Sequence, residues 1–201
     1  LYGEHLLANR HSPAPGQAAW ASGESGNYLG GFSHGTSGIA QSLFRLFYLT
    51  KDQKYQEVAE KALRFDQSLF DSEKGAWKDN RRSEGQYAHH WCHGSMGVGL
   101  SRIMMSDYTA NSTVGTEINQ ALQNLRNHGY KSSDSLCHGN FGDTELFLQA
   151  GMHFQDSSLS EEAKQRGYNC VLQKEARGFY QVDGPKGFIQ PGLFTGLAGV
   201  G

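Results

Sequence analysis

Apolar residues recur at helical spacing along most of the chain, and the segments that carry them are of two kinds. One kind is largely apolar and begins at a glycine-rich turn. The other has an apolar face opposite a face of Lys, Glu and Gln residues. Such spacing predicts α-helices, and a two-faced helix buries only its apolar side. The pattern therefore predicts pairs of helices, each with a buried member and an outer, amphipathic member.

Seven helical segments follow from this pattern, separated by loops. They are the tail of a helix in 1–9, an apolar helix in 36–49, an amphipathic helix that Asp52 caps and that reaches about residue 69, a helix opened by the turn at 93–97, an amphipathic helix in 114–127, a helix opened by the turn at 138–142, and a polar-faced helix in about 159–173. The segments 11–30, 71–90, 128–135 and 178–190 predict loops, the last with a short hairpin. No strand pattern alternates with the helices, so the expected class is all-α.

The turn before each apolar helix repeats one motif, His-Gly-x-x-Gly. Copies stand at 34–38, 93–97 and 138–142, and a degenerate copy with Thr in place of His stands at 195–199. The interval between copies is long enough for two helices and their loops. A repeated helix pair predicts an α/α toroid, with apolar helices in an inner ring and amphipathic helices in an outer ring. The motif-bearing turns, which we call the rim turns, should then gather at one end of the ring.

Metal-binding side chains occupy matching places in these turns. Cys92 and Cys137 directly precede the His-Gly step of the second and third copies, and His138 follows Cys137. A helix N-terminus lowers the pKa of a nearby thiol, and two thiolates with one imidazole bind zinc while one coordination position stays open. That is the pattern of a catalytic site. The alternatives are two buried apolar cysteines, a disulfide, or a structural zinc site completed by His34 or His93.

The other histidines and the third cysteine stand in different contexts. His34 fills the His slot of the first copy and is a candidate general acid or base near the metal. His93 either faces the substrate or packs within its turn. His89 and His90 are interpreted as loop residues or as outer partners of the ligands. Cys170 lies in a polar-faced helix and is interpreted as structural.

Length and charge exclude several classes of protein. The chain has 201 residues and a formal net charge of −2, with no basic run of the kind that binds nucleic acids and no apolar run long enough to cross a bilayer. Three cysteines disfavour a framework made only of disulfides, and no secretory segment is seen, so we expect a cytoplasmic protein. Because the chain begins with Leu1 and stops inside the fourth rim turn, we expect a partial domain over 1–201, truncated at both ends.

Several longer motifs carry a family resemblance. They are Gly-Phe-Ser-His-Gly-Thr-Ser-Gly-Ile-Ala at 31–40, Ser-Leu-Phe at 68–70 with Gly-Ala-Trp at 75–77, His-Trp-Cys-His-Gly at 90–94, Ser-Leu-Cys-His-Gly-Asn-Phe-Gly at 135–142 and Pro-Gly-Leu-Phe-Thr-Gly-Leu-Ala-Gly at 191–199. Through these motifs the sequence resembles the lanthionine synthetase C-like cyclases, and most closely the cyclase domain of the class II lanthipeptide synthetases (LanM). The resemblance spans nearly the whole chain.

The resemblance implies an α/α toroid of seven helix pairs, of which this chain holds about the last half. It also implies that Cys92, Cys137 and His138 are the zinc ligands and that His34 is the acid or base. His93 stands where single-domain relatives often carry Tyr. A catalytic Asp in the family's N-terminal half, and the dehydratase domain that precedes the cyclase in LanM proteins, lie outside this sequence.

The function implied by the resemblance is zinc-dependent formation of (methyl)lanthionine thioether rings in lantibiotic biosynthesis. A cysteine thiolate of a dehydrated precursor peptide would add to the β-carbon of dehydroalanine or dehydrobutyrine, and His34 would protonate the resulting enolate. The expected partners are that peptide and a membrane export complex, with no nucleic acid. Two alternatives stay open: a non-catalytic LanC-like protein that binds zinc and a thiol such as glutathione, and a carbohydrate-active toroid, which needs paired carboxylates at the rim.

Overall fold

The structure, a computed structural model, describes residues 2–22, 26–81, 86–184 and 190–200. The helices in this part of the chain are α1 (Tyr2–Ala8), α2 (Thr36–Thr50), α3 (Gln53–Ser68), α4 (Ser95–Met105), α5 (Thr113–His128), α6 (Asn140–Phe154) and α7 (Ser157–Arg177), with 3₁₀ helices η1 (Ser106–Tyr108) and η2 (Leu197–Gly199). Two antiparallel strand pairs complete it, β1 (Ala21–Ser22) with β2 (Asn27–Tyr28) and β3 (Phe70–Asp71) with β4 (Ala76–Trp77).

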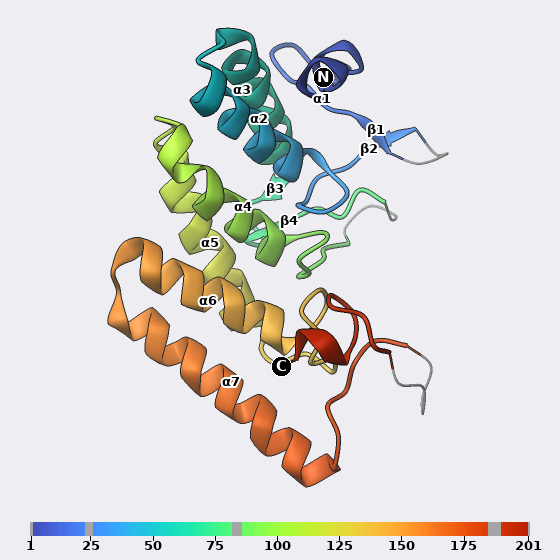
Figure 1. Cartoon of the computed structure of the whole chain (residues 1–201), viewed down its shortest axis with the longest axis vertical. Helices are drawn as coiled ribbons and strands as arrows, with labels where there is room; N and C mark the ends of the chain where they lie inside the picture. Colours follow the sequence, from blue (N-terminus) through green and yellow to red (C-terminus); the bar gives the residue numbers. More distant parts are fainter. Residues whose placement is uncertain (1, 23–25, 82–85, 185–189, 201) are drawn as a thin grey trace.

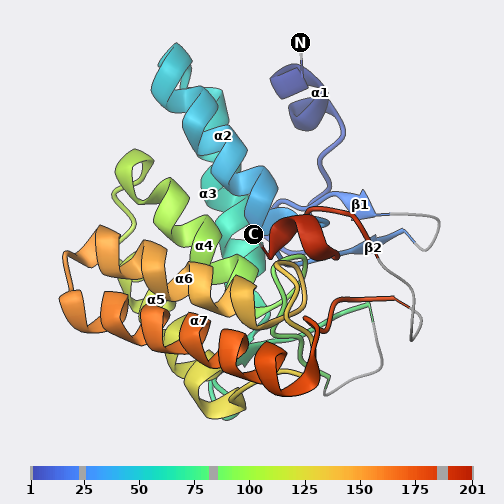
Figure 2. The same cartoon turned by 60° about the horizontal axis from the view of Figure 1, so that its bottom comes forward.

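The long helices form two layers that follow one another as successive pairs (Figure 1). In the inner layer α2 contacts α4 and α4 contacts α6, while α3, α5 and α7 each pack on the inner helix that precedes them. Figure 2 shows the same three pairs from another side. The arrangement is an open portion of an α/α toroid, which confirms the predicted fold class.

Side-chain caps set where two of the outer helices begin. Asp52 accepts a hydrogen bond from the Lys54 backbone N–H at 3.2 Å, and Asp156 accepts one from the Ser158 N–H at 2.8 Å. The first cap confirms the sequence prediction. The second starts α7 two residues earlier than predicted, because the Asp156 carboxylate satisfies an otherwise unpaired N–H. The helix also runs longer than predicted, to Arg177, and Gly178 caps it in the left-handed conformation with a φ of +86°.

The predicted loops differ from the structure in two places. The segments 11–30 and 71–90 hold or border the strand pairs β1–β2 and β3–β4, and strands of only two residues leave no readable alternation in the sequence. The hairpin predicted in 178–190 falls partly on residues 185–189, which lie outside the described residues. The described remainder of that segment contains no strand.

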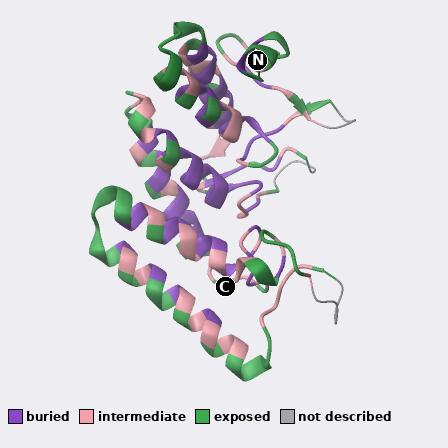
Figure 3. Cartoon of the chain, in the orientation of Figure 1, coloured by how far each residue is buried: buried purple, intermediate pink, exposed green. Residues whose placement is uncertain are grey.

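A buried ion cluster ties four helices together. The guanidinium of Arg102 on α4 donates to Asp66 on α3 at 2.6 Å and to Glu117 on α5 at 2.5 Å. Ser37 on α2 donates to the same Asp66 oxygen at 2.6 Å. Figure 3 shows that the buried residues concentrate where the helices face one another. We call this group the Arg102 cluster, and it fixes how the first two helix pairs sit against each other.

The four rim turns are structurally equivalent, the degenerate copy included. In each turn the first helical residue donates its backbone N–H to the carbonyl seven positions earlier, at 2.8–3.3 Å. A Cβ on the second glycine of each turn would lie 1.9–2.1 Å from the carbonyl oxygen six positions earlier. These second glycines are Gly38, Gly97, Gly142 and Gly199. Each is therefore required by close approach to the backbone of its own turn, and this shared packing explains why the motif repeats.

Candidate metal centre

Backbone hydrogen bonds join the rim turns to one another. The Ser33 N–H donates to the Cys92 carbonyl at 3.3 Å. The Trp91 N–H donates to the Cys137 carbonyl at 2.8 Å, and the Cys137 N–H donates to the Phe194 carbonyl at 2.7 Å. The rim turns thus gather as predicted, and the two cysteines that stand before the His-Gly steps come together.

Two sulfur atoms meet at one nitrogen atom in this place. Cys92 Sγ lies 3.4 Å and Cys137 Sγ lies 3.7 Å from Nε2 of His138. Tetrahedral zinc with bonds of about 2.3 Å to sulfur and about 2.0 Å to nitrogen places such atoms about 3.6 Å apart. Both sulfur-to-nitrogen distances and the donor chemistry therefore suit a shared zinc ion.

A carboxylate from a distant part of the chain orients His138. Its Nδ1 lies 2.8 Å from Oδ2 of Asp183, which also accepts a hydrogen bond from the Ser135 hydroxyl at 2.8 Å. Because a carboxylate only accepts, Nδ1 carries the proton and Nε2 is left facing the sulfurs. Metal-ligating histidines usually have a partner of this kind. Sequence reasoning misses Asp183, because it stands in a loop without a counterpart in the other repeats.

The thiols of Cys92 and Cys137 shift each other's pKa values in opposite directions. The hydrogen bond with Cys137 is the largest cause that lowers the pKa of Cys92, and the same bond raises the pKa of Cys137. The prediction that a helix N-terminus lowers both values is therefore wrong for Cys137. Each cysteine stands three residues before its helix, whereas the helix dipole acts mainly within the first turn.

The same contacts favour the protonated form of the His138 imidazole. Its pKa is raised to about 9, first by the hydrogen bond with Cys92 and also by Asp183, although desolvation opposes the shift. At Nε2 a metal ion would therefore compete with a proton. Metal binding has to displace the remaining protons, so its affinity should fall on acidification.

His90 is a further donor at this centre. Ligand atoms of His90, Cys92 and His138 all lie within 4.8 Å of one another. The rings of His90 and His138 meet edge to face, with centroids 4.7 Å apart. His89 lies apart, with Nδ1 at 2.6 Å from Oδ1 of Asn124. Interpretation as a loop residue therefore suits His89 but not His90. The sequence feature that could have identified His90 as a donor is the His-x-Cys spacing within its rim turn.

The two predicted catalytic histidines stack on one another beside the centre. The ring centroids of His34 and His93 are 5.1 Å apart, with an angle of 18° between the planes. His93 is buried, and its Nδ1 lies 3.2 Å from the Gly30 carbonyl oxygen. Burial is the largest cause that lowers its pKa. This geometry favours the packed interpretation of His93, while His34 is exposed and can meet a substrate.

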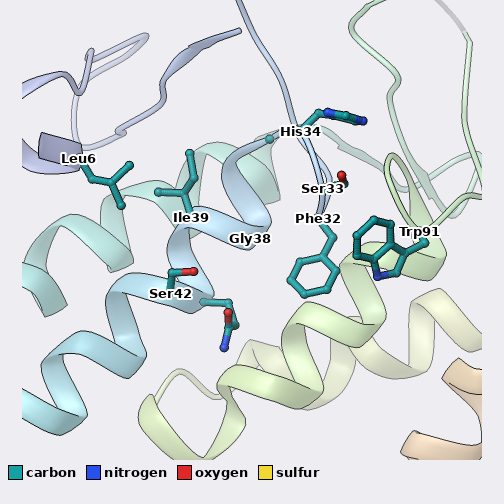
Figure 4. Close-up of a pocket in the computed structure, with 10 residues that line it drawn as sticks. Leu6, Phe32, Ser33, His34, Gly38, Ile39, Ser42 and Trp91 are labelled. Atoms are coloured by element: carbon teal, nitrogen blue, oxygen red, sulfur yellow. The ribbon is translucent and has the colours of Figure 1, made fainter. Parts of the chain in front are cut away.

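Two cavities share an aromatic wall next to the rim turns. One has a volume of about 500 Å³ and the other about 570 Å³, and both are lined by Phe32 and Trp91. The Trp91 ring stacks on Phe194 with centroids 4.4 Å apart. Figure 4 shows Phe32 and Trp91 side by side, with His34 at the edge of the first cavity. Apolar groups of a ligand can therefore be accommodated close to His34.

The cysteines are all free. Cys92 and Cys137 do not form the disulfide that was one of the alternatives. Cys170 is fully buried on α7, and burial is the largest cause that raises the pKa of its thiol to about 11. Such a thiol is unreactive, which agrees with a structural role.

Known proteins resemble this chain in sequence and in fold. Residues 2–201 match the family described as "Lanthionine synthetase C-like protein". Over 186 residues the chain is 25% identical to the lacticin 481/lactococcin biosynthesis protein LcnDR2 of Lactococcus lactis subsp. lactis, a match that covers 86% of this chain and 20% of that protein. Nisin cyclase has a similar structure, with a TM-score of 0.68 and 16% identity over 86% of this chain and 44% of that chain.

The matched lengths differ between this chain and its relatives. The chain spans about a fifth of its curated relative and less than half of nisin cyclase. None of the described helices combines the length and the apolar character that a bilayer crossing needs. The family match extends over almost every residue, and the motifs that it covers include the rim turns. The chain therefore belongs to the lanthionine synthetase C-like family.

Proposed function

We propose that this chain is part of a zinc-dependent lanthipeptide cyclase, in which a peptide cysteine is joined to a dehydrated residue as a thioether. The observation that carries the proposal is the meeting of two cysteine sulfurs at Nε2 of His138. The relatives support the substrate class, since one is named for lacticin biosynthesis and another is a nisin cyclase. Because both are longer than this chain, we infer a partial cyclase domain, of the LanM type, within a larger protein.

The ligands of the proposed ion are Cys92, Cys137 and His138. Asp183 holds the imidazole of His138 in the tautomer that leaves Nε2 free to bind. A bound zinc ion lowers the pKa of a thiol that it coordinates, so that a thiolate is available at neutral pH. The aromatic wall of Phe32 and Trp91 suits the apolar parts of a dehydrated peptide.

Ring formation needs a proton donor as well as a thiolate. The peptide sulfur forms a bond to the β-carbon of dehydroalanine or dehydrobutyrine, and the α-carbon takes up a proton. We assign that proton to His34, because it is exposed and stacks on the residue that follows Cys92. A positioned acid of this kind contributes about 10²–10⁴-fold to the rate.

The expected partner is a dehydrated precursor peptide, and the expected compartment is the cytoplasm. Association with a membrane export complex stays a prediction from the family resemblance.

Cyclisation of a dehydrated precursor peptide by the full-length protein tests the proposal. The readouts are the zinc content of the protein and the loss of alkylatable peptide thiols by mass spectrometry. Cys137→Ala should lose both zinc and ring formation, whereas His34→Asn should keep zinc and slow ring formation by about 10²-fold or more. Cys170→Ala is the matched control and should keep both.

Three outcomes would overturn parts of this account. Stoichiometric zinc in Cys137→Ala would remove Cys137 from the ligand set. Unchanged rate and ring stereochemistry in His34→Asn would remove His34 from the mechanism. A full-length protein that binds zinc and glutathione but leaves the dehydrated peptide open would favour the non-catalytic alternative.

A further inference from the structure

We infer that His90 is a fourth protein ligand of the metal in the resting protein and that the incoming substrate thiol replaces it. The inference rests on the proposed function, because it concerns the same ion. It adds a residue to the ligand set of Cys92, Cys137 and His138 that the resemblance implies.

The position of His90 is fixed by its own rim turn. Its backbone N–H donates to the His93 carbonyl at 2.9 Å, and its carbonyl accepts from the Gly97 N–H at 3.2 Å. Trp91, which separates His90 from Cys92 in sequence, packs against Phe194 instead. With Trp91 packed elsewhere, the side chains of His90 and Cys92 can share one site. The two backbone hydrogen bonds fix the position of His90 within its turn.

The spacing of the donor atoms allows a shared ion. One ligand atom from each of His90, Cys92 and His138 lies within 4.8 Å of the other two. Cys137 Sγ lies outside this group of three but only 3.7 Å from His138 Nε2, so it is the fourth donor within reach of the same ion. Two sulfurs and two nitrogens fill the four positions of tetrahedral zinc, which is the closed arrangement of a structural site. A thiol can then enter only if one of the four donors leaves.

His90 is the donor that can leave at the lowest cost. The two cysteines bind as charged thiolates, and His138 is anchored through Nδ1 to Asp183. In the described part of the chain, no carboxylate hydrogen-bonds to the ring of His90. In the exchange, the bond from the His90 nitrogen breaks, a bond to the substrate sulfur forms, and the thiol proton passes to solvent. No electrons are transferred, and the ion keeps four ligands throughout.

X-ray absorption of the zinc-loaded full-length protein tests the exchange, because outer-shell scattering counts imidazole ligands. The resting protein should show two sulfurs and two imidazoles. Saturating N-acetylcysteine amide should change this to three sulfurs and one imidazole. His90→Ala should show two sulfurs and one imidazole before thiol is added, bind zinc at least about tenfold more weakly, and bind the thiol more tightly. His89→Ala, which alters the neighbouring histidine, should behave like the parent.

The outcomes separate this inference from the proposed function. One imidazole in the resting parent, unchanged in His90→Ala, would overturn the inference and leave the three-ligand centre intact. Two imidazoles that persist when the thiol binds would also overturn it, because His90 would then not be displaced. A parent protein that binds no zinc at all would instead overturn the proposed function.

Discussion

The molecule contains two separate clusters of polar side chains, the Arg102 cluster and the candidate metal centre. They differ in whether all their binding partners come from the protein itself. In the Arg102 cluster a buried guanidinium faces two carboxylates, and none of its buried polar atoms lacks a hydrogen-bond partner. In the candidate metal centre, thiols meet imidazoles, and a metal ion binds thiols as thiolates and imidazoles through an unprotonated nitrogen. The first group finds all its partners within the protein, whereas the role proposed for the second requires a cation from solution.

The comparison shows how a buried polar group can be assigned to structure or to chemistry. Arg102 lies in the last turn of α4 and reaches helices on both sides, so its partners hold the helix layers in register. The metal centre lies in the rim turns, outside every helix, and its residues come from turns that the fold brings together. Loss of the first group should therefore cost stability, while loss of the second should cost metal binding.

The largest effect expected from this contrast is on folding. Arg102→Ala leaves Asp66 and Glu117 as uncompensated buried charges, which should lower the free energy of unfolding by about 3–5 kcal/mol. Chemical denaturation of the full-length protein measures it. Arg126→Ala, which removes an exposed ion pair with Glu162, is the control and should cost about 1 kcal/mol or less. Equal losses in both variants would show that the Arg102 cluster is not special.

A smaller effect is expected at the edge of the metal centre. Asp183→Asn removes the charged acceptor for Nδ1 of His138, so zinc affinity should fall by about 10–100-fold while the thermal stability of the metal-free protein changes little. Competition with a coloured chelator measures the affinity. The exposed Asp107 offers a control, and Asp107→Asn should bind zinc like the parent. If Asp183→Asn lowered stability but left zinc affinity unchanged, Asp183 would belong with the structural residues.

The helix pairs and three of the proposed donors can be predicted from the sequence because both follow from repetition. Matching positions in repeated turns lie at the same end of the helix layers. The sequence alone therefore predicts that Cys92 and Cys137 lie at one rim. The apolar periodicity is long and regular, and the predicted helices therefore agree with the structure except at their ends.

The remaining residues of the centre escape this reasoning for a physical reason. His90 occupies a position where the first and third copies carry Gly31 and Ser135. A comparison of the repeats therefore does not identify His90 as a donor. Asp183 reaches His138 only because the loop after α7 returns to the rim, which no local pattern encodes. The pKa of Cys137 likewise depends on a contact with Cys92 across two turns, and not on the helix that follows it.

The central claim is that Cys92 and Cys137 bind the same ion, and cobalt substitution tests it most directly. The intensity of the thiolate-to-cobalt charge-transfer absorption of the full-length protein scales with the number of cysteine ligands. Cys92→Ala and Cys137→Ala should each reduce that intensity by about half per bound cobalt, or abolish binding, while Cys170→Ala leaves it unchanged. Full intensity in either of the first two variants would contradict the account.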